Sequence, residues 1–157
     1  MPSSIAPEDA ALALLERHFQ AMPPVAALQL RIEDFDGRCL ALAAPLAAHV
    51  NDKGCAFGGS LASLMTLAAW GLVTLRLARI GLAADVFVAD SQVRFHAPLF
   101  ADLRARASLA DESEWDGFVL RLRDRGRAGL HVDASVALPD GATAASGRLR
   151  YVAIAKG

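Results

Sequence analysis

A polar loop runs directly into a long apolar stretch at residues 51–60, which read NDKGCAFGGS. The first turn of a helix has backbone N–H groups without internal partners, and the helix dipole places partial positive charge there. Gly58 and Gly59 carry no side chain that would block an approaching ligand. A helix that begins here is expected to bind an anion or to stabilise an oxyanion forming on a carbonyl. The alternative is that the two glycines only allow close packing against a strand or a second subunit.

The helix itself is predicted to run from Gly58 to Ile80 and to end at Gly81. Residues 55–75 contain no charge, and these 21 residues reach the length of a membrane span. Glycines, serines and a threonine interrupt the stretch, however, and the rest of the chain has the pattern of an amphipathic sheet that needs something to cover. We therefore expect a core helix wrapped by a sheet, and no membrane partner.

The other elements follow from hydrophobic spacing and from turn residues. Before the central helix, we expect a helix at residues 7–22 that Pro23-Pro24 ends, strands at 26–34 and 38–44 joined by Asp36-Gly37, and a loop at 45–57. After it, we expect only strands, at 84–97, 102–110, 118–123, 130–138 and 148–154, with a loop between Pro139 and Gly147.

Strict alternation assigns faces to two of these strands. In residues 102–110, one face holds Leu103, Ala105, Ala107 and Leu109. In residues 84–97, one face holds Phe87, Ala89, Val93 and Phe95, and the other holds Asp90, Gln92, Arg94 and His96.

One long helix against one antiparallel sheet is an α+β layout, here in a single domain of residues 1–157. A single sheet leaves edge strands to cover, which favours a dimer.

Composition and charge limit the class of protein and the partners that can be expected. The chain has 157 residues, of which 54% are hydrophobic and 21% are charged, so it can bury a sizeable core. Its net charge of -1 gives no electrostatic reason to expect a nucleic-acid partner. Residues 121–127 hold four arginines, which we interpret as the solvated face and tip of a hairpin. Cys39 and Cys55 have no CxxC spacing and are expected to be reduced thiols in a cytoplasmic protein.

The motif NDKGxAFGGSL at residues 51–61, with Trp70-Gly71 following on the helix, resembles the signature of hotdog-fold acyl-CoA thioesterases. It resembles more closely the thioesterase-like domain at the C-terminal end of YiiD-type acetyltransferases. Residues 90–98 also look like the strand that follows the hotdog helix. The resemblance implies a sheet wrapped around one long helix, here with an extra N-terminal helix. It also implies a homodimer or dimer of dimers with thioester sites at the subunit interface, and no cofactor besides the coenzyme A of the substrate.

Only some of the site residues of related thioesterases are present in this sequence. In the related phenylacetate-pathway thioesterases, the pattern is Asn, two residues, Gly, two residues, His-Gly-Gly, and then an acidic residue farther along the helix. Four positions match it here: Asn51, Gly54, Gly58 and Gly59. Phe57 stands in place of the histidine, and Thr66 falls at the position of the helical acid. The carboxylate that acts there as base or nucleophile is therefore missing.

Other residues could supply the chemistry. Asp52 could be the base, or it could cap the loop by bonding backbone N–H groups. Asn51 could hold water or polarise the carbonyl, or it could form an Asx turn. Ser63 and Thr66 share a helix face, where they would line an acyl tunnel or simply bond back to the preceding turn. Gly59 is the strongest candidate, as a backbone N–H donor to the oxyanion, because that role needs no side chain.

Signals elsewhere are weaker. Asp90 could approach the site of a partner subunit, or it could be an exposed strand carboxylate. Arg94, Arg148 and Arg150 could pair with coenzyme A phosphates, or only solvate the sheet. The four histidines have no metal-ligand spacing, so no metal site is expected.

Three functions remain open. The first is hydrolysis of an acyl-CoA or acyl-carrier thioester, with Asn51 or Asp52 handling the water. The second is binding of an acyl thioester without catalysis, which the replacements at Phe57 and Thr66 motivate. The third is a hotdog dehydratase or hydratase, which ranks last because that chemistry needs a histidine with a partner acid.

Overall fold

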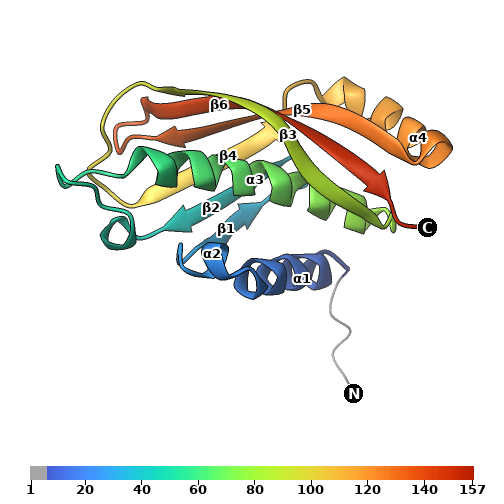
Figure 1. Cartoon of the computed structure of the whole chain (residues 1–157), viewed down its shortest axis with the longest axis horizontal. Coiled ribbons are helices and arrows are strands. Elements are labelled where there is room, and N and C mark those ends of the chain that lie inside the picture. The colour runs from blue at the N-terminus through green and yellow to red at the C-terminus, as the bar shows by residue number, and fades with distance from the viewer. Residues whose placement is uncertain (1–6) are drawn as a thin grey trace, which may run out of the picture.

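The computed structural model describes residues 7–157 and places one long helix against one antiparallel sheet (Figure 1). The central helix α3 spans Gly58–Arg79, as predicted. Buried residues occur along its whole length and on nearly every side, from Ser60 to Leu77. The helix is long and apolar enough to span a membrane by length and composition alone, but 56% of its most apolar window is buried inside the protein. Its apolar surface is therefore largely covered by the chain itself.

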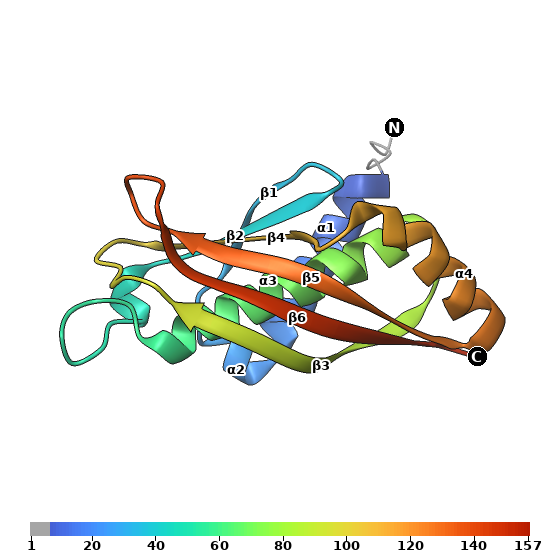
Figure 2. The same cartoon turned by 90° about the horizontal axis from the view of Figure 1, so that it is seen from above.

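The sheet has six strands in the order β1-β2-β4-β5-β6-β3, and all neighbours are antiparallel. The strands are β1 Arg31–Phe35, β2 Cys39–Ala44, β3 Ala84–Phe95, β4 Leu103–Leu109, β5 Arg127–Ala137 and β6 Thr143–Ala155. Figure 2 shows the long strands β5, β6 and β3 crossing the length of α3. The predicted inward face of β4 is confirmed, because Leu103, Ala105, Ala107 and Leu109 are all buried. The edges of the sheet are β1 and β3.

The N-terminal helix is confirmed as α1, Pro7–Ala21, and a single helical turn, α2 Pro23–Ala26, follows it. Helix α1 packs on the side of α3 that the sheet leaves open (Figure 1). Leu15 and Phe19 are buried there, and the Phe19 ring lies 6.0 Å from that of Trp70. On the sheet side, the buried hydroxyl of Tyr151 donates to the backbone oxygen of Thr66 at 2.5 Å. Burial raises the pKa of Tyr151 above its ordinary value.

The strand expected at residues 118–123 is wrong, because this segment is helix α4, Trp115–Arg125. Its buried residues are Trp115, Phe118, Val119 and Leu122, whose spacing fits one helix face. A 3-10 turn, Glu112–Glu114, precedes it, and the turn predicted at Gly126 is the left-handed C-cap of the helix, with φ 71°. The four arginines therefore lie on the end of a helix and the start of β5, and not on a hairpin.

Several strand boundaries also differ from the prediction. The first strand begins at Arg31 and not at residue 26, because α2 and the turn after it take up the preceding residues. The last begins at Thr143, so the loop is shorter than expected and Gly147 lies inside β6, paired with Val93. The hairpin at Asp36-Gly37 is confirmed, since the Asp36 carboxylate accepts the backbone N–H groups of Arg38 and Cys39 at 2.9 and 2.7 Å. Those two bonds lower the pKa of Asp36.

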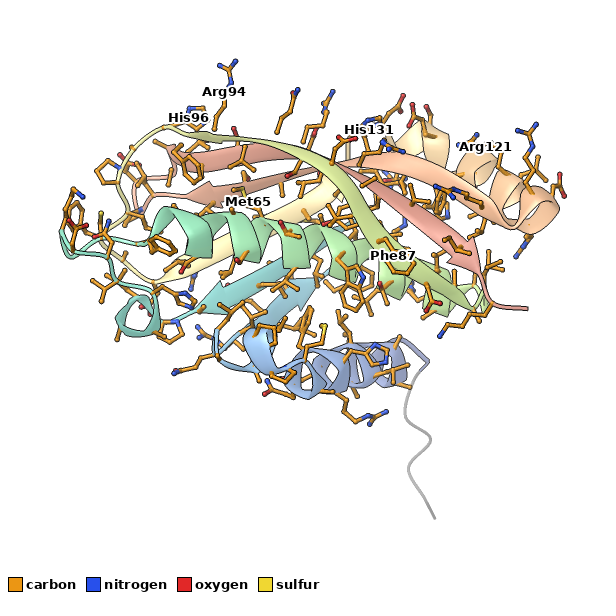
Figure 3. The ribbon with its side chains drawn as sticks, viewed as in Figure 1. Met65, Phe87, Arg94, His96, Arg121 and His131 are labelled. Atoms are coloured by element: carbon orange, nitrogen blue, oxygen red, sulfur yellow. The ribbon has the colours of Figure 1, made fainter. Side chains whose placement is uncertain are left out.

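The faces predicted for residues 84–97 are wrong in the first half of β3. A β-bulge between Val88 and Asp90 inserts one extra residue, Ala89, and shifts the alternation. Val88 pairs with the inward-facing Tyr151, whereas Phe87 pairs with Val152 and is turned away from the core. After the bulge the predicted alternation holds, and Arg94 and His96 point to the outer side of the sheet (Figure 3).

Leu40 and Leu15 pack closely against α3 at Gly71. A Cβ atom there would lie 2.8 Å from the Leu40 side chain and 3.2 Å from that of Leu15.

We expect Gly71→Ala to lower the free energy of unfolding by about 1–3 kcal/mol through overpacking, measured by urea denaturation. Gly117→Ala in α4 is the matched control, because the added Cβ meets only the end of the flexible Arg121 side chain. It should raise that free energy by up to about 1 kcal/mol through helix propensity. Equal effects of the two substitutions would contradict this packing.

Candidate active site

The loop at residues 45–57 is fastened to the start of α3 by backbone hydrogen bonds. Phe57 N–H donates to the His49 oxygen at 2.7 Å, and Ala56 N–H donates to the Leu99 oxygen at 2.8 Å. At the other end of the loop, the Asp102 carboxylate accepts the Leu46 N–H at 2.9 Å. These hydrogen bonds therefore fix the conformation of the loop beside the start of α3.

The first turn of α3 has free donors. Phe57 is the N-cap, with φ -62° and ψ 133°, and its carbonyl accepts the N–H groups of Ser60 and Leu61. Within the described residues 7–157, the N–H groups of Gly58 and Gly59 have no hydrogen-bond acceptor, and the first turn holds no acidic side chain. Two donors and the positive end of the dipole of a 22-residue helix are thus available to a ligand.

Two exposed phenylalanines flank these donors. A Cβ atom on Gly59 would lie only 2.4 Å from the Phe57 ring, and one on Gly58 would lie 3.6 Å from the ring of Phe95 on β3. The Phe57 and Phe95 side chains are 57% and 58% exposed, which is unusual for rings of this size. The glycine pair therefore sits between two apolar surfaces, and the Phe57 ring occupies the space that a side chain at Gly59 would need.

An open groove of about 480 Å³ runs along α3 from its first turns. It is lined by Pro24, Val25, Leu28, Ala62, Ser63, Thr66 and Leu67. Ser63 lies four residues after Gly59, and Trp70 lies four residues after Thr66, so these positions share one helix face. The Trp70 ring bridges to β3 through its Nε1, which donates to the Val86 oxygen at 2.9 Å. The groove and the free N–H groups are thus on the same stretch of α3, and Trp70 lies at the far end of that stretch.

The side chains of Asn51 and Asp52 make hydrogen bonds within the loop. Asn51 forms the Asx-type turn that was its alternative role, since its Oδ1 accepts the N–H groups of Lys53 and Cys55 at 2.8 and 3.1 Å. Its Nδ2 donates to the Cys55 sulfur at 3.2 Å. The Asp52 side chain is 79% exposed, and its carboxylate pairs with Lys53 at 2.9 Å. Both remain predicted catalysts, but the geometry of this chain shows only their roles in the loop.

The other predicted binding residues divide into two groups. Ser63 and Thr66 line the groove, although the Thr66 hydroxyl donates to the Ala62 oxygen at 2.8 Å and so bonds back to its own helix. Gly54 is exposed in the loop turn with φ 83°, a left-handed conformation that favours glycine. Met65 is fully buried in the core and is not part of the groove lining.

Asp90 and the arginines lie on the outer face of the sheet, which is the side away from α3. Asp90 pairs with Arg150 at 3.0 Å, and Asp133 binds Arg148 through two bonds of 2.7 and 2.9 Å. The bond to Asp133 raises the pKa of Arg148. Arg94 and Arg148 border a hollow of about 580 Å³ on this face. Two of the three arginines proposed for coenzyme A phosphates are therefore already paired with carboxylates.

Sequence reasoning missed His49 and Ser60, which are buried next to the glycines. The His49 Nδ1 and the Ser60 Oγ lie 2.8 Å apart. The sequence offered only a weak signal, a hydroxyl at the third helical position and a histidine 11 residues before it in the loop. Within the part of the chain that the structure describes, no group of three or more His, Cys, Asp or Glu side chains is placed to hold a metal ion.

A protein family and several solved structures are similar to this chain. The family described as "Putative thioesterase (yiiD_Cterm)" matches residues 12–155. A protein of unknown function from Chlorobaculum tepidum is 27% identical, with a TM-score of 0.89 over 98% of this chain and 99% of its own. A putative thioesterase from Shewanella oneidensis is 26% identical, with a TM-score of 0.82 over 93% and 99% of the two chains. The predicted hotdog fold is confirmed by these similarities.

The Asn51 turn can be tested separately from catalysis. Asn51→Ala removes the acceptor of two backbone N–H groups and should cost about 1 kcal/mol of unfolding free energy. The Lys53 and Cys55 amides should also exchange faster with deuterium. Asn51→Asp keeps the acceptor and should keep both amides protected, and Asp52→Ala should leave their exchange unchanged. Protected amides in Asn51→Ala would show that the side chain does not hold the turn.

Proposed function

Because the chain belongs to the YiiD C-terminal thioesterase family, we propose that it hydrolyses acyl thioesters at the N-terminus of α3. The observation that supports this most directly is the pair of unpartnered N–H groups at Gly58 and Gly59, at the start of the helix whose residues Ala62, Ser63, Thr66 and Leu67 line an apolar groove. A thioester has the matching chemistry, namely a carbonyl oxygen that gains negative charge during attack and an apolar chain attached to the same carbon. A site of this kind favours the transition state over the ground state.

In this mechanism the carbonyl oxygen accepts hydrogen bonds from the Gly58 and Gly59 N–H groups. Water attacks the carbonyl carbon, the oxyanion that forms is stabilised by the two donors and the helix dipole, and the C–S bond then breaks to release the thiol. We assign the proton of the attacking water to the Asp52 carboxylate, which has the freedom of an exposed loop side chain, and this proton passes to the leaving sulfur. The acyl chain lies against Ser63, Thr66 and Leu67, and Trp70 limits its length. The reaction requires no cofactor, and coenzyme A enters as part of the substrate.

We further propose that the active form is a homodimer or a dimer of dimers that uses the edge strand β3. This strand is 12 residues long, and within residues 7–157 no strand pairs with its outer edge. It exposes Phe87, Val88 and Phe95, and Phe57 lies beside Phe95 across the glycine pair. Long apolar edges are normally covered. A second subunit on this edge would cover the rings and exclude water from the glycine donors.

Thiol release from acyl-CoA and acyl-carrier thioesters of increasing chain length tests the function. We expect release above background, with a preferred chain length, and a loss of about 10²–10⁴-fold in kcat for Asp52→Asn if that carboxylate is the base. Activity within about twofold of wild type would remove Asp52 from the mechanism. Binding of acyl-CoA without release would instead favour an acyl-thioester-binding protein, which the apolar Phe57 beside the donors would suit. Hydration of trans-2-enoyl thioesters would favour the hydratase alternative.

Substitution at Gly58 tests the oxyanion donors directly. Proline removes the N–H group at a helix position where proline is well tolerated, and the extended backbone of Phe57 suits a following proline. We expect Gly58→Pro to lower kcat by about 10²–10³-fold with the fold retained. Gly58→Ala is the matched control, because it keeps the N–H group and its Cβ makes only ordinary contact with Phe95. Similar kcat values for the two variants would exclude Gly58 N–H as a donor.

A charge on the β3 edge tests the proposed dimer. Val88→Lys should shift the protein from dimer to monomer in sedimentation velocity and lower its activity, because the site needs the second subunit for cover. Leu120→Lys places the same charge on a more exposed apolar residue of α4, which is not part of the sheet edge, and should leave the dimer intact. A wild-type monomer, or a dimer that only Leu120→Lys dissociates, would contradict this interface.

A further inference from the structure

Two buried polar side chains of the described region meet beside the first turn of α3. His49 and Ser60 are 4% and 8% exposed. Their side chains meet at 2.8 Å, with His49 in the loop and Ser60 in the first turn of α3. Burying polar groups is costly unless they are hydrogen-bonded, so a pair of this kind usually specifies one arrangement of the backbone.

His49 joins three segments through three hydrogen bonds. Its Nε2 donates to the Leu28 oxygen at 2.7 Å, and because a carbonyl can only accept, this bond places the ring proton on Nε2. In the neutral ring Nδ1 is then an acceptor, so the Ser60 hydroxyl donates to it. The His49 backbone oxygen accepts the Phe57 N–H at 2.7 Å. One residue therefore connects the segment after α2, the loop and the first turn of α3.

The segment after α2 is held in an unfavourable conformation at this contact. Gln29, next to Leu28, has φ 55°, and it is the one non-glycine residue of the described chain with positive φ. A side chain in this region costs free energy, and such residues persist where their surroundings hold them. Leu28 itself lines the groove. The hydrogen bond from His49 to the Leu28 oxygen thus holds a residue that lines the groove, next to the strained backbone of Gln29.

We propose that His49 and Ser60 are positioning residues that set the distance between the α2 wall of the groove and the first turn of α3. Neither group lies in the groove lining, so they act through the backbone and not by touching substrate. By fixing the Leu28 wall against Ser60, they align the Gly58 and Gly59 N–H groups with a carbonyl whose acyl chain lies in the groove. This inference rests on the proposed function for its effect on rate, but not for its effect on the geometry of the first turn.

Kinetics of Ser60→Ala, Ser60→Thr and Tyr151→Phe test the rate effect. Ser60→Ala removes the donor to His49 and should lower kcat by about 10- to 100-fold with KM within about twofold of wild type, because the donors are misplaced. Ser60→Thr keeps the hydroxyl and should restore most of the rate. Tyr151→Phe removes another buried hydroxyl that bonds α3, to Thr66, and should lower the melting temperature without this loss in kcat. His49→Leu should behave as Ser60→Ala if it folds.

Amide NMR gives a readout that does not depend on turnover. In Ser60→Ala the Gly58 and Gly59 amide resonances should move more than in Tyr151→Phe, and wild-type His49 should show a protonated Nε2 and an unprotonated Nδ1. If wild type releases no thiol from any thioester, the proposed function fails, and the amide shifts alone decide whether His49 and Ser60 position the first turn. A lower melting temperature in Ser60→Ala, with kcat and the Gly58 and Gly59 amides unchanged, would overturn the proposal.

Discussion

Helix α3 is apolar on nearly all sides, and the rest of the chain is arranged to cover it. Buried residues such as Leu64, Met65, Leu72 and Val73 point in different directions around its axis. A flat sheet can cover only one side of a helix, so the six strands curve around α3 and α1 closes much of the remaining side (Figure 1). At Gly71 the absence of a side chain lets Leu40 and Leu15 approach the helix from two different layers.

The site occupies the part of α3 that this cover does not complete. The sheet and α1 meet around Trp70, where the indole bonds the β3 backbone and packs near Phe19. Toward the N-terminus of α3, residues of the short α2 turn and Leu28 line the groove beside the exposed face of the helix. A 15-residue helix covers only part of a 22-residue one, and the groove and the free N–H groups lie toward the N-terminal part of α3. His49 and Ser60 then fix how wide the uncovered part is at its start.

Long elements with a consistent hydrophobic period were predictable from the sequence, and elements whose period changes were not. Helix α3 and strand β4 each follow one pattern from end to end. Residues 118–123 also alternate, because Phe118, Leu120 and Leu122 are apolar, but Trp115 and Val119 complete a helical face that a six-residue window does not reveal. In the site, the glycine motif was visible because backbone donors need no particular side chain. The His49–Ser60 pair was not, because it depends on a contact between residues 11 positions apart that no periodicity encodes.

The β-bulge at Ala89 has a consequence for how the exposed edge can be used. A long regular edge can accept a second strand in several registers that differ by two residues, and it can recruit further chains without limit. The extra residue between Val88 and Asp90 interrupts the regular spacing of the edge and increases the local twist. Most alternative registers would therefore bring a bulged stretch against a regular one and lose hydrogen bonds. An irregularity that disturbs the alternation of side chains in this strand thus discriminates against fibrous polymerisation and favours a closed, symmetric pairing.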